Sequence, residues 1–464
     1  MIVSTTGLGS GIDIQSLVTQ LATAETQPQL NAIQRQRDTA SARLSGLGLL
    51  KSGLSDFQTA LSPLKDGSAF RTHTATSSNE SAVKITADSY AVAGNYAVEI
   101  SQLAKAQKSL TNTEFANFAS TLNSGTLSFT ATSGATFDVV VDSSNNSLEK
   151  VRDAINKADG NSFVSASIIN VDNATHTGTI SKLVLTAKNT GVANAFTVNA
   201  SENGVTTGDV ALTQLSSANL NVQTAAADAV ISVDGQTATR SSNKITDVLP
   251  GITLDLLAKT DAEKPASLDV GIDTEAITNS INGFVTAYNK LNGIVKNLGK
   301  YGGSTGGSGN GALIGDSTLR SVATQIRQST TAVVPSAGSN LNSLAMIGVS
   351  VDKNGVMSLD STKLKTALAA NFQSVSDVFS SADGVATKLT SKLSTLLQSG
   401  GSIDTQQTSL NKAISKLDIQ KDSVDIRFKK VQQALQRQFI AMDTSVGQFK
   451  NTGAFLANWI NSLN

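Results

Sequence analysis

The residues of this chain that could do chemistry are few and far apart. The 464-residue sequence contains two histidines, His73 and His176, and no cysteine. Each histidine lies in a Thr-rich segment without a second metal ligand nearby, which is more typical of a surface residue than of a metal site. The absence of cysteine excludes disulfides and thiol catalysis. No nucleophile, base and orienting group can be assembled from the remaining residues, so the sequence predicts no enzyme, no metal and no cofactor.

Four aspartates deserve separate consideration, because paired carboxylates are the usual acid–base machinery of hydrolases. Asp13, Asp316, Asp352 and Asp360 each lie near Gly, Ser or Asn at the expected boundary of an element. Aspartate is favoured at helix N-caps and in turns, where its carboxylate accepts backbone N–H hydrogen bonds. We therefore predict that these four residues are caps and turn residues.

Two glycine-rich stretches resemble phosphate-binding loops only loosely. Residues 7–11 (GLGSG) lack the third glycine of a dinucleotide fingerprint, and residues 302–311 are not followed by the Lys-Ser/Thr of a phosphate loop. The chain has 36 basic and 36 acidic residues and no basic patch interleaved with aromatics, so we predict no nucleic-acid partner. No apolar run approaches the ~18 residues of a membrane span, and we predict no membrane insertion.

The strongest pattern lies in the C-terminal segment, which repeats apolar residues at alternating steps of three and four. A period of 3.5 lets a helix bury one narrow strip against another helix. Lys421 and Gly453 interrupt the strip, and an extra step of four after Leu435 is a stutter. This C-terminal seam comprises Leu410, Ile414, Leu417, Val424, Phe428, Val431, Leu435, Phe439, Met442, Val446, Phe449, Leu456 and Ile460.

A weaker strip near the N-terminus is a candidate partner for the C-terminal seam. We predict that Pro28 breaks or kinks its helix, and that Gly46 and Gly48 act as hinges. The alternative to a paired coiled coil is that the two segments are ordinary amphipathic helices in a globular core. This N-terminal seam comprises Ile14, Leu17, Leu21, Leu44, Leu47, Leu54, Phe57 and Leu61.

Between the two seams the apolar period changes to two, which is typical of strands. Alternation runs from about residue 73 to 272, with a helix at 147–158 and a hairpin turn at Asp234-Gly235. Helical spacing returns at 277–295, and further helices are expected at 319–326, from Leu364 through Val375, and at 385–396. A hairpin is expected around Asn354-Gly355.

This order predicts a multidomain α+β fold. The terminal α-helices pair as a coiled-coil leg, a helical domain follows, and the inserted antiparallel β-rich domains form the head. The predicted domains are 1–42 with 420–464, 43–72 with 273–419, 73–106 with 223–272, and 107–222.

Several strings along the chain resemble a known family. The chain is similar to the flagellar hook-associated protein 2 family, which caps bacterial flagellar filaments, and the resemblance is weakest over residues 107–222. The strings lie at residues 1–14 (MIVSTTGLGSGIDI), 93–107 (AGNYAVEISQLAKAQ), 147–156 (SLEKVRDAIN), 273–277 (DTEAI), 313–320 (LIGDSTLR) and 359–364 (LDSTKL).

The resemblance implies a structural cap that retains exported flagellin and promotes its folding and insertion. It implies a homo-oligomeric ring, most simply a pentamer, with flagellin and the hook-filament junction proteins as partners. An export chaperone is expected to bind within Leu410–Ile460. The N-terminus lacks the pattern of a secretory signal, so export through the flagellar channel to the filament tip is expected. The alternatives are another axial protein (flagellin or a junction protein) and a tip adhesin whose β domains bind host glycans.

Overall fold

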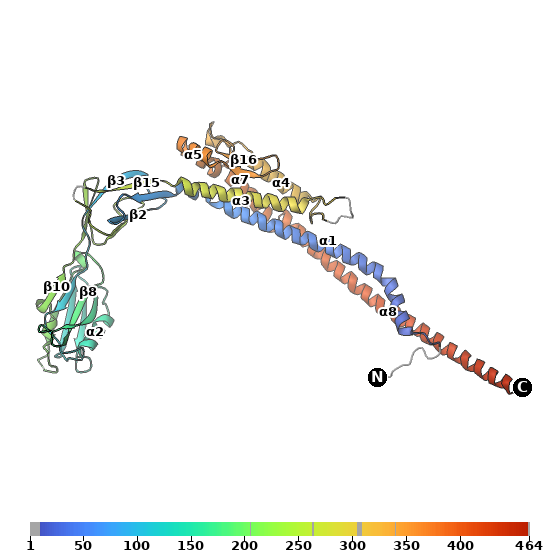
Figure 1. Ribbon diagram of the computed structural model, residues 1–464, viewed down its shortest axis with the longest axis horizontal. Helices are drawn as coiled ribbons and strands as arrows, with labels where there is room; N and C mark the ends of the chain where they lie inside the picture. Colours follow the sequence, from blue (N-terminus) through green and yellow to red (C-terminus); the bar gives the residue numbers. More distant parts are fainter. Residues whose placement is uncertain (1–9, 205, 262–263, 304–308, 339, 463–464) are drawn as a thin grey trace. The chain divides into compact units, whose positions relative to one another are not determined.

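A computed structural model describes residues 10–204, 206–261, 264–303, 309–338 and 340–462 (Figure 1). Residues 1–9 of the N-terminal string, and the centre of the 302–311 loop, lie outside the described residues. The chain divides into two compact units, which we call the helical unit (1–69 and 274–464) and the β-rich unit (70–273). This confirms the mixed α+β class, whereas the finer division into four domains stays a prediction.

The helical unit contains the two terminal helices, shorter helices between them and one β-hairpin. Its elements are α1 (Ile14–Lys65), α3 (Thr274–Gly299), α4 (Ser317–Thr330), β16 (Val349–Val351), β17 (Met357–Leu359), α5 (Ser361–Ala370), α6 (Phe372–Ser380), α7 (Val385–Leu397) and α8 (Ser402–Asn461).

The four aspartates singled out in the sequence hold helix starts and one turn, as predicted. Asp13, Asp316 and Asp360 each accept a 3.0 Å hydrogen bond from a backbone N–H in the first turn of a helix. Asp352 accepts two hydrogen bonds of 2.8 Å from backbone N–H groups of the β16–β17 turn. Such caps satisfy backbone donors that have no partner within the helix. The cap and turn prediction is confirmed.

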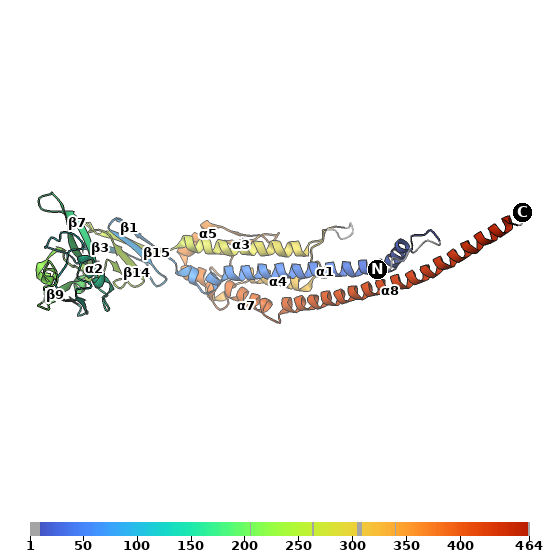
Figure 2. The ribbon, with the colours of Figure 1, turned by 90° about the horizontal axis from the view of Figure 1, so that it is seen from below.

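Pro28 does not break α1, so of the two predicted outcomes, a break or a kink, the break is wrong and the bend of the helix agrees with the kink (Figure 1). The helix runs without interruption from Ile14 to Lys65 and includes both Pro28 and Pro63. It does bend toward its N-terminal end (Figures 1 and 2). A proline inside a helix lacks one hydrogen-bond donor and crowds the preceding turn, which bends a long helix without ending it when tertiary packing holds both sides.

The helix expected to include Leu364 to Val375 is two helices. Asn371 separates α5 from α6 and adopts an extended backbone with φ −159° and ψ 90°. Its side chain accepts a 3.0 Å hydrogen bond from the backbone N–H of Ser374. Asparagine stabilises an N-cap better than a helix interior, because its amide competes with the helical backbone. The helical spacing of apolar residues continues from α5 into α6, so the sequence pattern alone did not show the break between the two helices.

The core of the helical unit contains four aromatic rings where α1 meets α3 and α6. The ring of Phe57 stacks on that of Phe284 at a centroid distance of 5.8 Å, and lies edge-on to Tyr288 at 6.2 Å. Phe284 is in turn edge-on to Phe379 of α6 at 6.1 Å. Aromatic pairs in these geometries contribute about 0.5–1.5 kcal/mol beyond the area that they bury. Burial also raises the pKa of the Tyr288 phenol, because the charged form loses water.

Two glycines of α1, expected to be hinges, have different surroundings. A Cβ at Gly46 would lie 3.2 Å from side-chain atoms of Ala312, Leu298 and Leu313, whereas a Cβ at Gly48 would meet nothing within 4 Å. Both positions lie inside the continuous helix. Gly46 therefore permits a close approach to the end of α3, and Gly48 has no such packing role.

This difference predicts opposite outcomes for two alanine substitutions. Gly48→Ala is expected to raise the free energy of unfolding by about 0.5–1 kcal/mol, because alanine favours the helix over glycine. Gly46→Ala is expected to lower it, because the crowding outweighs the same gain. Thermal unfolding of both variants beside the unmodified chain measures the effect. Equal stabilisation by the two variants would show that Gly46 is not tightly packed.

The β-rich unit has two apolar cores. The first is built on two sheets with strand orders β1-β15-β3-β11-β12 and β13-β14-β2, and it contains Val98, Ile100 and Leu254. All their pairings are antiparallel, and the predicted hairpin turn at Asp234-Gly235 joins β11 to β12. The strands are β1 (His73–Ser77), β2 (Val83–Ala87), β3 (Gly94–Gln102), β11 (Ala229–Val233), β12 (Gln236–Arg240), β13 (Lys244–Ile245), β14 (Ile252–Leu256) and β15 (Ala266–Ile272).

The second core lies between β4 and β10 along the chain and packs around α2 (Leu148–Lys157). Its sheets have the orders β10-β4-β8-β7 and β6-β5-β9. Phe129 stacks on Phe137 at 4.5 Å, where β5 pairs with β6. The strands are β4 (Lys108–Thr111), β5 (Gly125–Ala131), β6 (Thr136–Val141), β7 (Val164–Asp172), β8 (Thr179–Ala187), β9 (Phe196–Glu202) and β10 (Leu220–Thr224).

Candidate partner-binding seam of the terminal helices

The two terminal helices run antiparallel, side by side, in both views of the molecule (Figures 1 and 2). Polar contacts between them fix the register, since residue numbers fall along α1 as they rise along α8. Ion pairs between half-exposed side chains contribute only about 0.2–1 kcal/mol each, so they specify alignment more than stability. The contacts between the helices are Arg37–Asp418 at 2.7 Å, Glu25–Arg427 at 2.8 Å and Thr19–Gln432 at 3.4 Å, and Ser10, just before α1, contacts Asp443 at 2.7 Å.

The buried contact between these helices is short. Ile33 of α1 and Leu417 and Val424 of α8 form one buried cluster, with Leu30 packed against it. Fully burying a Leu or Val side chain contributes about 1.5–3 kcal/mol. Near its start α8 also buries Ile403. The cluster is therefore one apolar layer of the pairing, and Ile14, Val18 and Ala22 are also buried nearer the start of α1.

The predicted members of the N-terminal seam differ in burial. Of its predicted members, Ile14, Leu47, Leu54, Phe57 and Leu61 are buried, and Leu17 and Leu44 are half-buried. Leu21 is 42% exposed, so its placement in the seam is wrong. The buried positions there are Val18, Ala22 and Thr26. These residues are four positions apart and therefore share one face of the helix with Ile14. The sequence pattern favoured Leu21 because leucine is larger and more apolar, but the smaller residues are the buried ones.

Burial along the C-terminal seam declines toward its end. Leu417 and Val424 are buried, and the residues from Leu410 and Ile414 through Phe428, Val431, Leu435, Phe439 and Val446 are mostly half-buried. Met442 is exposed by 40%, Leu456 by 47%, Ile460 by 55% and Phe449 by 76%. The last part of the seam has no partner within the described chain.

Lys421 interrupts the seam but forms its contact within α8. Its Nζ lies 2.7 Å from Oδ2 of Asp425, one helical turn on. The hydrogen bond to this carboxylate, with its negative charge, holds the pKa of Lys421 above the ordinary value. Because the lysine side chain stays exposed and paired, the interruption places no unpaired charge between the helices.

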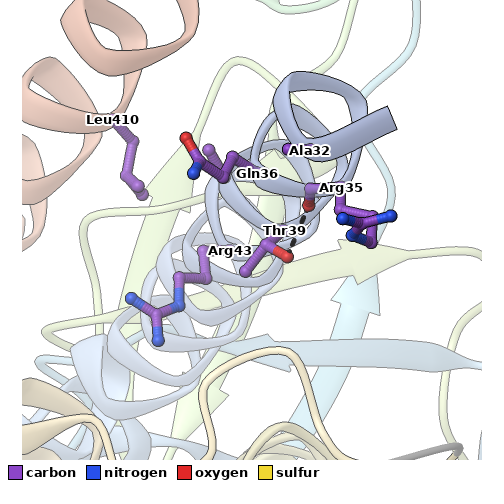
Figure 3. A pocket seen from close by; sticks show the side chains of 7 residues that line it. Ala32, Arg35, Gln36, Thr39, Arg43 and Leu410 are labelled. Atoms are coloured by element: carbon purple, nitrogen blue, oxygen red, sulfur yellow. Dashed lines mark hydrogen bonds between the residues drawn. The ribbon is translucent and has the colours of Figure 1, made fainter. Parts of the chain in front are cut away.

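An open groove of about 390 Å³ separates α1 from the beginning of α8. Leu410 of α8 lies across the groove from α1, where Gln36 and Arg43 extend toward its side and Arg35 points away from it (Figure 3). The Thr39 hydroxyl donates a 2.8 Å hydrogen bond to the Arg35 carbonyl and so stays on its own helix. Leu410 is only half-buried, and the open groove shows that the helices are loosely packed here.

The end of α8 extends past α1. Among the described residues, the polar contact to the N-terminal segment that lies farthest along α8 is made by Asp443, while α8 continues to Asn461 (Figure 1). We call residues 444–461 the α8 tail; at ~1.5 Å per residue it is roughly 27 Å long. Its exposed apolar side chains are Phe449, Phe455, Leu456, Trp459 and Ile460. At ~100° per residue they lie within an arc of roughly 140°, which makes one apolar face.

The other candidate residues from the sequence are not brought together. His73 is half-buried with its Nδ1 3.1 Å from the Asp88 carbonyl oxygen, whereas the His176 side chain is 80% exposed and its Nδ1 is 3.6 Å from Asp172. Across the described residues, no three His, Asp or Glu side chains gather as metal ligands. A separate search of those residues finds no helix that is both long and apolar enough to cross a membrane.

Comparison with protein families gives two matches that together cover most of the chain. Residues 10–107 match the flagellar hook-associated protein 2 N-terminus, and residues 226–451 match the flagellar hook-associated protein 2 C-terminus. The unmatched stretch between them contains most of the second core of the β-rich unit.

Individual relatives match over nearly the whole length. The chain is 32% identical to the B-type flagellar hook-associated protein 2 of Pseudomonas aeruginosa, covering 93% of this chain and 92% of the relative. It is 32% identical to flagellar hook-associated protein 2 of Escherichia coli, with 98% and 97% covered.

Among solved structures, the chain resembles the D1-D2-D3 domains of the flagellar cap protein FliD from Escherichia coli. The TM-score is 0.63 at 30% identity, and the match covers 79% of this chain and 99% of that one. Sequence identity, family matches and fold agree: the chain belongs to the flagellar hook-associated protein 2 family.

Proposed function

We propose that this chain is a structural cap at the distal end of a bacterial flagellar filament. Family membership supports this role, as does the similarity to a solved flagellar cap protein. The observation that carries the proposal is the α8 tail, which presents Phe449, Phe455 and Trp459 without a partner inside the described chain. A contiguous exposed apolar face is typical of an interaction site in a soluble protein.

The mechanism follows from the antiparallel helices. They form a stalk whose far end, the α8 tail, grips an axial partner as an amphipathic helix grips a groove. The β-rich unit is an insertion in the sequence of the helical unit, and the chain continues into the helical unit at both ends of the insertion, at Ala69 and at Thr274. Several copies of the chain form a ring, most simply a pentamer, which retains flagellin subunits while they fold and insert. Flagellin and the hook-filament junction proteins are thus the proposed partners, and the filament tip outside the cell is the proposed location.

Before assembly, the apolar tail needs protection. An exposed strip such as Phe449, Leu456 and Ile460 promotes association of unassembled chains. We therefore propose that an export chaperone covers part of Leu410–Ile460, and that the chain leaves the cell through the flagellar export channel. Retained chaperone binding after deletion of this segment would place the footprint elsewhere.

Glycan binding by the β-rich unit is the alternative role. The loop between β7 and β8 exposes the polar side chains of Thr175 and Thr177 beside the half-buried Asn173. These side chains hydrogen-bond one another at 2.8–3.2 Å, which leaves few free donors for a sugar. The cap is the better-supported role.

A genetic complementation experiment tests the capping role. A strain without this chain is expected to keep its hooks and to release unassembled flagellin into the medium, and the unmodified chain should restore filaments. The triple variant Phe449→Ser/Leu456→Ser/Ile460→Ser is expected to restore less than a tenth of the filaments, because the tail loses its apolar face. Leu49→Ser, at a 59% exposed site on α1, is the control and should restore filaments fully. Normal filaments in the strain without the chain would contradict the proposal.

A further inference from the structure

A second stripe of side chains runs along α8 on the side opposite the seam. It repeats the 4-3 spacing of a coiled coil between residues 412 and 440, and every residue in it is exposed. Isoleucines stand seven residues apart at Ile419 and Ile426, and again at Ile440. The alternating positions carry the cations Lys416, Lys430 and Arg437. We call this stripe the outer face of α8.

The isoleucines of the outer face are unusually open to solvent. Ile419 is 67% exposed and Ile426 is 56% exposed, although α8 is packed on its other side through Leu417 and Val424. At ~100° per residue, Ile419 lies about 160° around the helix from Leu417. β-Branched residues favour helices weakly, so propensity does not explain isoleucine at exposed helix positions. Their spacing of seven is that of residues which pack against another helix.

The cations of the outer face have no partner of their own. Lys416, Lys430 and Arg437 form no ion pair or hydrogen bond with any described residue. Nearby carboxylates are otherwise engaged, since Asp418 pairs with Arg37 and Asp425 pairs with Lys421. Asp422, the remaining carboxylate beside the stripe, adds to the field at Lys421.

The helical unit as a whole is positively charged, like the outer face of α8. Residues 1–69 and 274–464 contain 23 Lys and Arg against 16 Asp and Glu, a net charge of +7. Residues 70–273 contain 13 basic and 20 acidic residues, a net charge of −7. The neutral total therefore conceals a basic helical unit and an acidic β-rich unit. A basic surface attracts acidic partners and steers their association.

We propose that the outer face of α8 is a docking surface for an acidic amphipathic helix of another protein. Such a helix would bury its apolar residues against Ile419, Ile426 and Ile440, and place carboxylates beside Lys430 and Arg437. The pairing requires carboxylates, because a cation moved from water into a helix interface needs an opposite charge. The same face of a second copy is a poor occupant, because its lysines and arginine would repel those of the first copy.

The stripe also differs from a membrane-binding helix. A helix that lies on a membrane presents a wide apolar face with large residues. Here single isoleucines alternate with cations and polar residues such as Ser423 and Gln433. A narrow stripe with a 3.5-residue period fits one helix better than a lipid surface. The proposal does not depend on the capping role, because it rests on contacts of the helical unit alone.

Fluorescence anisotropy of synthetic peptides with the full-length chain tests the docking surface. The probe is a labelled three-heptad amphipathic peptide with leucine in its core positions and glutamate on both flanks; its twin carries lysine on the flanks. The acidic peptide is expected to bind, with an affinity that falls as salt rises, and the basic twin is expected to bind at least tenfold more weakly. Equal binding of the two peptides, or no binding of the acidic one, would overturn the proposal.

Matched variants locate the binding site. Ile419→Ser/Ile426→Ser and Lys430→Glu/Arg437→Glu are each expected to weaken binding of the acidic peptide at least tenfold. Phe449→Ser/Leu456→Ser alters the tail and should leave it unchanged. Loss of binding only in the tail variant would move the site off the outer face. Preferential binding of anionic vesicles, or a change in sedimentation of the Ile419→Ser/Ile426→Ser chain without peptide, would assign the face to lipid or to a second copy instead.

Discussion

Phe57→Ala is expected to lower the free energy of unfolding of the helical unit by about 3–5 kcal/mol, the usual effect of removing a buried phenylalanine. The side chain is fully buried, and its ring contacts those of Phe284 and Tyr288. Substitution leaves a cavity where α1 meets α3 and also removes the aromatic stacking. Urea unfolding monitored by circular dichroism at the helical signal measures the change.

A phenylalanine on the tail provides the control for this experiment. Phe455 is 68% exposed, so Phe455→Ala should change the free energy of unfolding by less than about 0.5 kcal/mol. If both variants lowered the free energy of unfolding by similar amounts, Phe57 would not be a central residue of the core. An unchanged stability for Phe57→Ala would contradict the packing of α1 on α3.

Leu417→Asp/Val424→Asp is expected to separate α8 from α1. These two residues provide the α8 side of the buried cluster with Ile33, and each contributes about 1.5–3 kcal/mol through its burial. Carboxylates at these positions would have to be buried without a partner, and separation of the helices avoids that state. Trypsin should then cut at Arg35, Lys429 and Lys430 at least tenfold faster, since cleavage requires local opening.

Ile419→Asp/Ile426→Asp is the matched control for the separation experiment. It introduces the same two charges into the same helix, but at positions 67% and 56% exposed. Trypsin cleavage of this variant should remain within twofold of the unmodified chain. If both double variants were cut equally fast, the buried cluster would not be what holds the helices together.

Period and turn chemistry were sufficient to predict most of the architecture. The 3.5-residue period predicted the long helix α8, and the Asp234-Gly235 and Asn354-Gly355 pairs predicted hairpins that the structure contains. The change to a period of two at residue 73 located the β-rich unit, which begins at Phe70. These signals depend only on neighbours in sequence, and single-sequence reasoning can therefore find them.

Features that depend on contacts across the chain were harder to predict. Short strands such as β4 and β10 carry few residues of alternating pattern and were missed, because their pairing partners lie far along the sequence. Near the start of α1 the buried positions are Val18, Ala22 and Thr26, and apolar periodicity gives little weight to such small or polar residues.

The outer face of α8 also escaped the sequence pattern. Its isoleucines lie on the same helix as the stronger apolar seam that faces α1. The exposure of Ile419 and Ile426 is what distinguishes the second stripe from that seam. In the same way, the charge difference between the units became visible only when the chain was divided at Ala69 and Thr274.

The distance between the terminal helices tests the account most directly, and the absence of native cysteine makes site-specific labelling simple. Spin labels on cysteines at Thr19 and Gln432, whose side chains lie 3.4 Å apart, should give a single short distance of about 10–20 Å in the full-length chain, because packed helices lie about 8–10 Å apart. Labels at Thr19 and Lys412 should lie roughly 30 Å apart along α8. A long distance for the first pair, or equal distances for both, would contradict the antiparallel stalk on which the proposed cap depends.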